Sequence, residues 1–267
     1  MTDPDDDEGP GRSDDISHGR NADPPALVGA ALPAALRAKF EIHSYRNAAS
    51  ILRHGFPDQF AAICAALDRF AITTAQIRTP GGSKSVIAKY VDTLFDDRWR
   101  EMRIAADLHV RLMSPKGSTV YGRYTRVGFL DGHRIDFVNG RVAVDLEWNS
   151  KDQTYDRDLS AFAAFYDAGA IDVAVILTRG SAMDGAFFRS LGRVLNKDGS
   201  EGAGAVHRKY GASTTWMGKL LYRLDAGRNG GCPVLAVGIT PRCVVDRAPP
   251  MDPLPLLDLD GDPALRH

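Results

Sequence analysis

The sequence predicts an α/β protein in which a mixed central sheet is flanked by helices. Three segments support this fold class: a hairpin over residues 134–149, a helix over residues 155–166 and a buried strand over residues 171–177. A strand that rejoins a sheet in parallel needs a long crossover, which is usually helical. The expected order along the chain is therefore strand, strand, helix, strand.

The hairpin is predicted from a turn signal between two alternating stretches. Asn139-Gly140 favours a two-residue type I′ turn, because both central positions of that turn need positive φ. With these two residues in the turn, Asp136 pairs with Ala143. One face of the hairpin then collects the apolar side chains, which are Ile135, Phe137, Val142, Val144, Leu146 and Trp148.

Three carboxylates, those of Asp136, Asp145 and Glu147, share the opposite face of this hairpin. Asp136 and Asp145 are expected as diagonal neighbours roughly 7 to 8 Å apart at the backbone, so their carboxylates can converge on one hard cation. Alternating charged and apolar residues are also what a half-exposed hairpin without any site shows. Three acids side by side favour the cation site, because like charges repel and need compensation.

The next two elements are predicted from a change in the spacing of apolar residues along the sequence. Residues 155–166 have apolar side chains at helical spacing, with Asp156 and Asp158 in the first turn. Residues 171–177 form a continuous, β-branched apolar run between Gly169 and Gly180, which is typical of a strand covered on both faces. The apolar helix positions are Leu159, Phe162, Ala163, Phe165 and Tyr166.

The rest of the chain permits simpler predictions. Helices are expected over residues 31–39 and 56–70, a further helix follows residue 85 and ends at Glu101, and residues 233–240 read as a last strand. The polar segment 196–215 is open to two interpretations, a loop over DNA or a solvated surface.

Acidic side chains gather at the two ends of the chain. Residues 1–30 hold eight acids and two arginines, a balance of −6, and residues 249–267 hold four acids and one arginine, a balance of −3. Since the formal net charge of the whole chain is −1, residues 31–248 carry +8. A basic middle suits a polyanion-binding domain, although proteins that never bind nucleic acid reach such charges too.

The same ends are predicted to be disordered tails on one domain over residues 31–248. The acidic N-terminal tail (1–30) is rich in Asp, Gly, Pro and Ser, and the acidic C-terminal tail (249–267) in Pro and Asp. Neither has the apolar residues that would offset its ordering entropy. Such tails either solvate the protein or compete with DNA for a basic cleft.

The composition argues against several other classes of protein, namely disulfide-rich, zinc-binding, membrane-spanning and secreted ones. The chain has 267 residues, 44% of them apolar, which is enough for the core of one large domain. Cys64, Cys232 and Cys243 lack C-x-x-C spacing, so neither a disulfide framework nor a zinc site is indicated. No apolar run is long enough to span a membrane, and the first residues are acidic where a signal peptide is basic. We therefore expect a cytoplasmic protein without a membrane partner.

The segment from Arg78 to Ser85 contains two glycines followed by Ser83, Lys84 and Ser85. Backbone N–H groups at the start of the next helix can hold a phosphate, with Lys84 adding charge. The glycine spacing of a Walker A motif is absent. A glycine turn followed by a serine helix cap explains the same residues.

Longer segments of the sequence resemble a known protein family. Residues 135–137 (Ile-Asp-Phe) followed by residues 144–153 (Val-Asp-Leu-Glu-Trp-Asn-Ser-Lys-Asp-Gln) resemble the BglII family of type II restriction endonucleases, within the PD-(D/E)XK nuclease superfamily. The similarity extends from about Ile42 to Ile239, and residues 81–85 and 213–220 support it. It implies a restriction-endonuclease-like core in an enzyme that cuts double-stranded DNA at a short, specific, palindromic sequence.

The resemblance also implies roles for particular residues. Asp136 and Asp145 become ligands of one or two Mg²⁺ ions, and Glu147 stands where the superfamily usually has lysine, so it would bind metal or orient and deprotonate the attacking water. Glu101 is a candidate accessory acid. The implied DNA-contacting residues are Lys84, Ser85, Asn149, Ser150 and Lys151.

The implied partners are double-stranded DNA, a second copy of the chain in a homodimer, and a cognate DNA methyltransferase. Two other functions remain open from sequence. A repair nuclease on the same core would cut by DNA structure instead of sequence. A DNA-binding protein without catalysis would hold a structural ion, or none, on the hairpin acids.

Overall fold

The computed structural model describes residues 22–247 except 83 and 212. Its centre is a six-stranded sheet in the order β1-β8-β5-β4-β3-β2. Strands β4, β5 and β8 run parallel, whereas β1, β3 and β2 join by antiparallel pairing. The predicted mixed sheet is therefore confirmed. The strands are β1 (Phe40–Tyr45), β2 (Arg100–Met113), β3 (Val120–Asn139), β4 (Val142–Glu147), β5 (Val173–Arg179) and β8 (Val234–Ile239).

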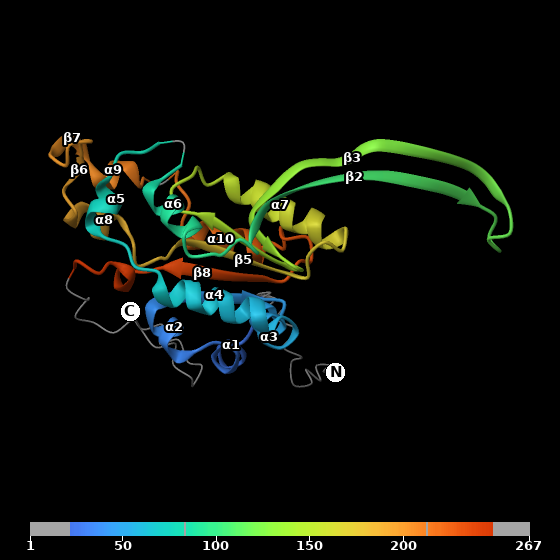
Figure 1. Cartoon of the computed structure of the whole chain (residues 1–267), viewed down its shortest axis with the longest axis horizontal. Helices are drawn as coiled ribbons and strands as arrows, with labels where there is room; N and C mark the ends of the chain where they lie inside the picture. Colours follow the sequence, from blue (N-terminus) through green and yellow to red (C-terminus); the bar gives the residue numbers. More distant parts are fainter. Residues whose placement is uncertain (1–21, 83, 212, 248–267) are drawn as a thin grey trace, which may run out of the picture.

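Helices cover both faces of this sheet (Figure 1). On one side lie α1 (Pro25–Ala31), α2 (Ala34–Lys39), α3 (Ala48–Gly55) and α4 (Pro57–Arg69), and on the other α7 (Thr154–Asp167) and α10 (Met217–Asp225). The remaining short elements are α5 (Thr74–Arg78), α6 (Val86–Asp92), α8 (Gly185–Ser190), β6 (Arg193–Leu195), β7 (Glu201–Ala205), α9 (Val206–Lys209) and a 3₁₀ turn (Pro241–Cys243). None of the helices described is long and apolar enough to cross a membrane.

Two hydrophobic cores lie on opposite faces of the sheet. In β5, Val173, Val175 and Leu177 point into the core beneath α4, while Ala174 and Ile176 point into the core beneath α7. A strand buried on both faces has no polar side to alternate with, which explains the continuous apolar run in its sequence. The predicted helix, crossover strand and last strand are confirmed as α7, β5 and β8.

The hairpin is present, but its predicted register is wrong by two residues. Asn139 pairs with Val142, so Gly140 and Arg141 form the turn, and of these two only Gly140 has positive φ (58°). A glycine at the first central position with positive φ is the type II′ requirement, which removes the need for positive φ at Asn139. A shift of two residues keeps each side chain on its face. It does, however, bring Asp145 opposite Asp136 instead of diagonal to it.

Two further expectations about the hairpin are wrong. Only one face of the hairpin was expected to be buried; Asp136 on β3 is indeed exposed, but all of β4 is buried because α7 packs on its acidic side. Ile135 was expected beside Phe137, yet it packs in the other core. Strand β3 has two residues between Ile135 and Val138 where β2 has one between their partners, and such a bulge reverses the facing of side chains.

The N-terminal region departs from prediction at Pro33. The helix expected over residues 31–39 begins only at Ala34, as α2, because Leu32 ends the preceding helix α1 and Pro33 caps α2. The helix α1 begins at Pro25 and buries Val28, so folded structure starts before residue 31, where the domain boundary was placed. The parts of the predicted tails in 1–21 and 248–267 lie outside the described residues.

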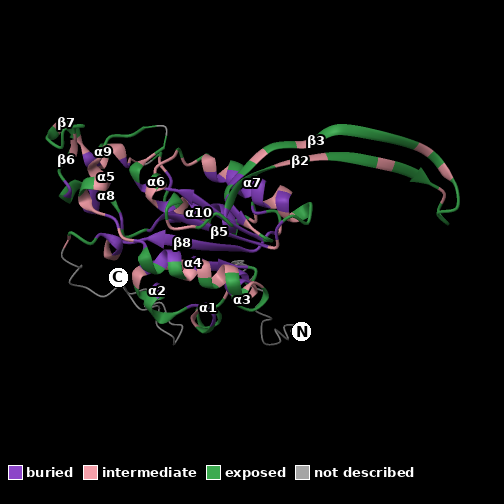
Figure 2. Ribbon diagram, viewed as in Figure 1, coloured by how far each residue is buried: buried purple, intermediate pink, exposed green. Residues whose placement is uncertain are grey.

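The longest feature that sequence reasoning missed is a two-stranded ribbon made of β2 and β3. Its distal part extends away from the sheet and the helices (Figure 1) and is exposed on both faces (Figure 2). Glu101 lies in β2 and not at a helix end, because α6 stops at Asp92. The backbone N–H of Arg98 donates to the Asp96 side chain at 3.1 Å, a turn that separates α6 from the strand.

Candidate active site

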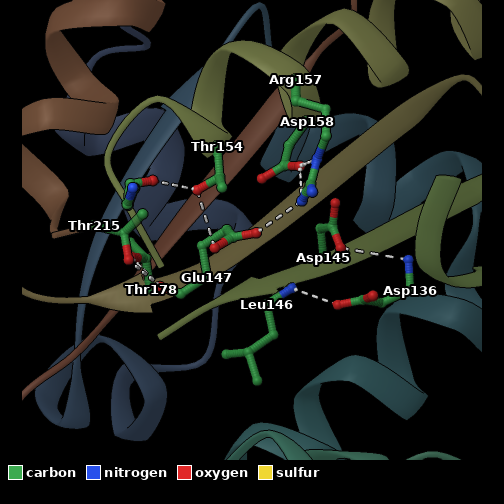
Figure 3. Close-up of polar contacts among 10 residues, drawn as sticks. Asp136, Asp145, Leu146, Glu147, Thr154, Arg157, Asp158, Thr178 and Thr215 are labelled. Carbon is green, nitrogen blue, oxygen red and sulfur yellow. Dashed lines mark hydrogen bonds and ion pairs between the residues drawn. The ribbon is translucent and has the colours of Figure 1, made fainter. Parts of the chain in front are cut away.

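Asp136 and Asp145 face each other at the end of the β3–β4 ladder (Figure 3). Continuing the register beyond Phe137 and Val144 makes them opposite neighbours. Each carboxylate accepts a backbone N–H of the other strand: Asp136 N–H donates to Asp145 Oδ1 at 3.4 Å, and Leu146 N–H donates to Asp136 Oδ2 at 3.3 Å. These bonds hold the two side chains between the strands.

The environments of these two carboxylates differ. Asp145 is 4% exposed, whereas Asp136 is exposed. Burial, followed by the nearby carboxylates of Asp136 and Asp158, raises the pKa of Asp145 well above its ordinary value. A cation beside Asp145 would offset both effects.

Glu147 is buried two residues further along β4, on the same side of the sheet as Asp145. Its Oε2 accepts from Thr154 Oγ1 at 3.3 Å, and its Oε1 lies 3.4 Å from Arg157 Nη2 (Figure 3). Its backbone carbonyl accepts from the hydroxyls of Thr178 at 2.7 Å and Thr215 at 3.3 Å. Helix α7 therefore holds the carboxylate of Glu147, while β5 and the segment before α10 hold its backbone carbonyl.

Sequence reasoning assigned Asp158 to the first turn of a helix and missed that it belongs to this site. Asp158 is 1% exposed; its Oδ1 accepts from Arg157 Nε at 3.0 Å and Nη2 at 2.9 Å, and its buried Oδ2 has no hydrogen-bond partner among the described residues. Burial and then Glu147 raise the pKa of Asp158 to about 8. A signal was present, since an acid three residues after Tyr155 and four before Phe162 lies on the apolar stripe of the helix.

The site thus holds four carboxylates, those of Asp136, Asp145, Glu147 and Asp158, and among the described residues only Arg157 forms ion pairs with any of them, namely with Glu147 and Asp158. Among the described residues, no three His, Cys, Asp or Glu side chains are close enough to form a metal site by themselves. Mg²⁺ does not need such a cluster, because it commonly uses one or two carboxylates together with waters and substrate phosphates. The oxygen-only donors and their excess negative charge fit a hard cation.

The predicted DNA-contacting residues fall into two groups. Asn149, Ser150 and Lys151 directly follow β4; Asn149 Oδ1 is buried without a partner in the part of the chain described, and Lys151 is exposed. Ser85 caps α6 by accepting from Ala88 N–H at 3.0 Å, as the helix-cap interpretation requires. Lys84 is paired with Asp92 at 2.5 Å, and Ser83 lies outside the described residues.

Glu101 lies closer to the acids than its distance along the chain suggested. Because Arg100 pairs with Val138 and Met102 with Ile135, its backbone lies opposite the bulge that contains Asp136. Its side chain is 62% exposed and lies 3.5 Å from that of Arg134. The strand brings Glu101 beside the site, and an ion pair holds its carboxylate.

A mixed sheet with facing carboxylates on two antiparallel strands, followed by a helical crossover to a parallel strand, defines a restriction-endonuclease-like nuclease core. The family model for restriction endonucleases BglII and BglIII matches residues 40–239 of this chain. The match covers well over half of the sequence, and the chain belongs to this family. It is thus a site-specific deoxyribonuclease that acts on double-stranded DNA. A search of curated proteins finds no match.

Proposed function

We propose that the chain is a type II restriction endonuclease that hydrolyses phosphodiester bonds at a short palindromic sequence in double-stranded DNA, and that it requires Mg²⁺. The pair of facing carboxylates, Asp136 and Asp145, carries this proposal. One of them is exposed to an incoming phosphate, while the other is buried with a raised pKa and needs a cation to be ionised.

Asp136 and Asp145 would hold one or two Mg²⁺ ions. When bound, Mg²⁺ offsets negative charge on the phosphate and makes water a better nucleophile. Glu147 accepts a proton from the attacking water, since Thr154 and Arg157 hold its carboxylate in one orientation. Asp158 lies beside Glu147, and because its pKa is raised to about 8 it is protonated below that pH and adds no negative charge next to Glu147.

Contacts to DNA are proposed for the residues at the end of β4. Asn149 and Ser150 lie just beyond Glu147, after Trp148, and Lys151 places an exposed cation there. Lys84 and Ser85, which precede α6, are proposed as a second contact. Lys84 would exchange its ion pair with Asp92 for a phosphate.

A homodimer would cut both strands of such a site. One set of acids cuts one strand, so two copies related by a two-fold axis match a palindrome. A cognate methyltransferase would protect the same sequence in the host DNA, and the enzyme would act in the cytoplasm, where that DNA lies.

The test compares wild type with Asp136→Ala and Asp145→Ala on supercoiled plasmid across a magnesium titration. We expect discrete fragments from wild type only when magnesium is present, and no cutting by either variant. Both variants should still bind the target duplex, because each loses negative charge that repels phosphate. Near-wild-type cutting by either variant would reject the assigned site, while a smear of fragments would indicate a nuclease without sequence specificity.

A further inference from the structure

The distal part of the β2–β3 ribbon, residues 108–127, is here called the distal arm. It contributes no residue to either hydrophobic core, and it projects away from the rest of the molecule (Figure 1). Large apolar side chains on it stay exposed, among them Leu112 at 56%, Tyr121 at 72% and Tyr124 at 57%. Packing against the folded domain therefore does not explain an ordered ribbon of this length.

The distal arm carries a net positive charge. It holds four cationic side chains, Arg111, Lys116, Arg123 and Arg126, and no Asp or Glu. Within the described residues, none of the four forms an ion pair, although Arg126 lies over the Phe129 ring at 5.4 Å. By contrast, Arg103 and Arg134, nearer the sheet, are paired with Asp131 and Glu101.

The cross-strand register divides the arm into two faces. Arg111 pairs with Arg123 and His109 with Thr125, which gives one basic face. The opposite face is mainly apolar and carries Leu108, Val110, Leu112 and Tyr124, together with Arg126, which pairs with Leu108. Two like charges directly opposite each other destabilise a ladder, so the Arg111–Arg123 pair is unfavourable until an anion lies between them.

We propose that the basic face of the distal arm binds the phosphate backbone of double-stranded DNA flanking the cut site. A two-stranded ribbon is narrow enough for the major groove, which is about 12 Å wide. From Leu108 to Met113 the arm spans roughly 17 Å at about 3.3 Å per residue. That is about half of a helical turn of about 34 Å, and the arm begins well beyond Glu101 along β2, so it reaches DNA beyond the duplex at the acids. This inference rests on the proposed function.

The test is the salt dependence of DNA binding by the double variant Arg111→Gln/Arg123→Gln in magnesium-free buffer. Two duplexes are compared, a short one limited to the cleavage site and a long one extended by about one and a half turns on each side. On the long duplex, the slope of log K against log salt should be less steep by about 1.8, because each lost phosphate contact accounts for about 0.9. Affinity at low salt should fall on the order of tenfold or more. On the short duplex, variant and wild type should agree.

The matched control is Leu112→Gln/Tyr124→Gln, which alters the opposite face of the same ribbon. Its slope on the long duplex should equal that of wild type, and thermal unfolding should show that all three proteins are folded. The proposal is overturned if the arginine variant keeps the wild-type slope on the long duplex. If, in addition, the control converts a dimer to a monomer in sedimentation, the arm binds a second copy of the chain instead.

Failure of this inference can be told apart from failure of the proposed function. Wild type that cuts plasmid into discrete fragments, with equal slopes for wild type and the arginine variant, contradicts only the role of the arm. Wild type that neither binds nor cuts any DNA contradicts both.

Discussion

At the residue scale, the site is organised by charges that the fold brings together against their repulsion. Asp145, Glu147 and Asp158 are each less than 5% exposed, and Arg157, the cation bonded to Glu147 and Asp158, is itself largely exposed. Taking a carboxylate out of water without full compensation is costly. Such a cost at neighbouring positions is typical of a functional site.

Glu147 gives the sharpest residue-level prediction. Glu147→Gln keeps an acceptor for Thr154 but loses charge and basicity, so we expect slow cleavage. Glu147→Lys should be slower still, because it places a cation beside Arg157 and close to the proposed metal ligands. Cleavage rates across a magnesium titration should rank wild type above glutamine and glutamine above lysine. A lysine variant as active as wild type would mean that charge on the phosphate, and not proton transfer, is what this position supplies.

The raised pKa of Asp158 predicts that the free energy of unfolding depends on pH. Its pKa, raised to about 8 in the folded protein, means that the folded state keeps a proton that the unfolded state releases near pH 4. The stability gained from this proton is present at low pH and is lost as pH rises to about 8. In magnesium-free buffer the free energy of unfolding of wild type should therefore fall over this interval, and that of Asp158→Asn should fall less. Urea denaturation at stepped pH measures both, and parallel curves would contradict the prediction.

At the element scale, the sequence predicted the strands and helix around the site because their burial leaves a pattern. The hairpin, α7 and β5 follow from alternation, helical spacing and a continuous apolar run. The register was not predictable from Asn139-Gly140 alone, since Gly140 serves either of two turn types. Asp158 was missed because its role depends on what α7 packs against.

The ribbon was missed for a different physical reason. Alternation in a strand comes from one buried and one exposed face, and the distal part of β2 and β3 has no buried face. Gly122, Gly128 and Gly132 further interrupt the β-forming residues there. In the sequence, this segment was marked only by a short alternation over residues 108–112 and by the absence of acids over residues 108–127.

Excision of the ribbon tests whether it is independent of the core. Ala106 pairs directly with Leu130, so an Asn-Gly turn replacing residues 107–129 should close the ladder. We expect a free energy of unfolding within about 1 kcal/mol of wild type, because no residue of either core is removed. Denaturant unfolding measures this, and a loss of cooperative unfolding would show that the ribbon contributes to folding.

At the scale of the whole molecule, positive charge lies within residues 22–247 and negative charge in the two end segments of the sequence. Residues 1–21 hold seven acids against two arginines, and residues 248–267 hold four acids against one, so the remaining residues carry +7. The sequence predicted this separation, but it placed the start of the domain at residue 31. Apolar content is low up to Pro25, and only packing reveals that Val28 is buried.

A shortened chain tests these boundaries. Residues 22–247 alone should fold and cut DNA at least as fast as the full chain, because the acids and the basic surface are retained and net negative charge is removed. A chain starting at residue 32 should lose about 2 kcal/mol of unfolding free energy, since α1 and its buried Val28 are gone. Denaturant unfolding and plasmid cutting measure the two effects. Equal stability of both shortened chains would contradict the packing role of α1.

The central claim is that paired acids on β3 and β4 make this chain a magnesium-dependent, sequence-specific endonuclease. Its most direct test is digestion of a fully sequenced plasmid with purified wild-type protein and Mg²⁺, followed by sequencing of both strands at every new end. The account predicts that all ends share one short palindromic sequence, with the two strands cut at symmetric positions, and that no ends form without magnesium. Ends at unrelated sequences, ends confined to nicks or branched structures, or equal cutting without a divalent metal would contradict it.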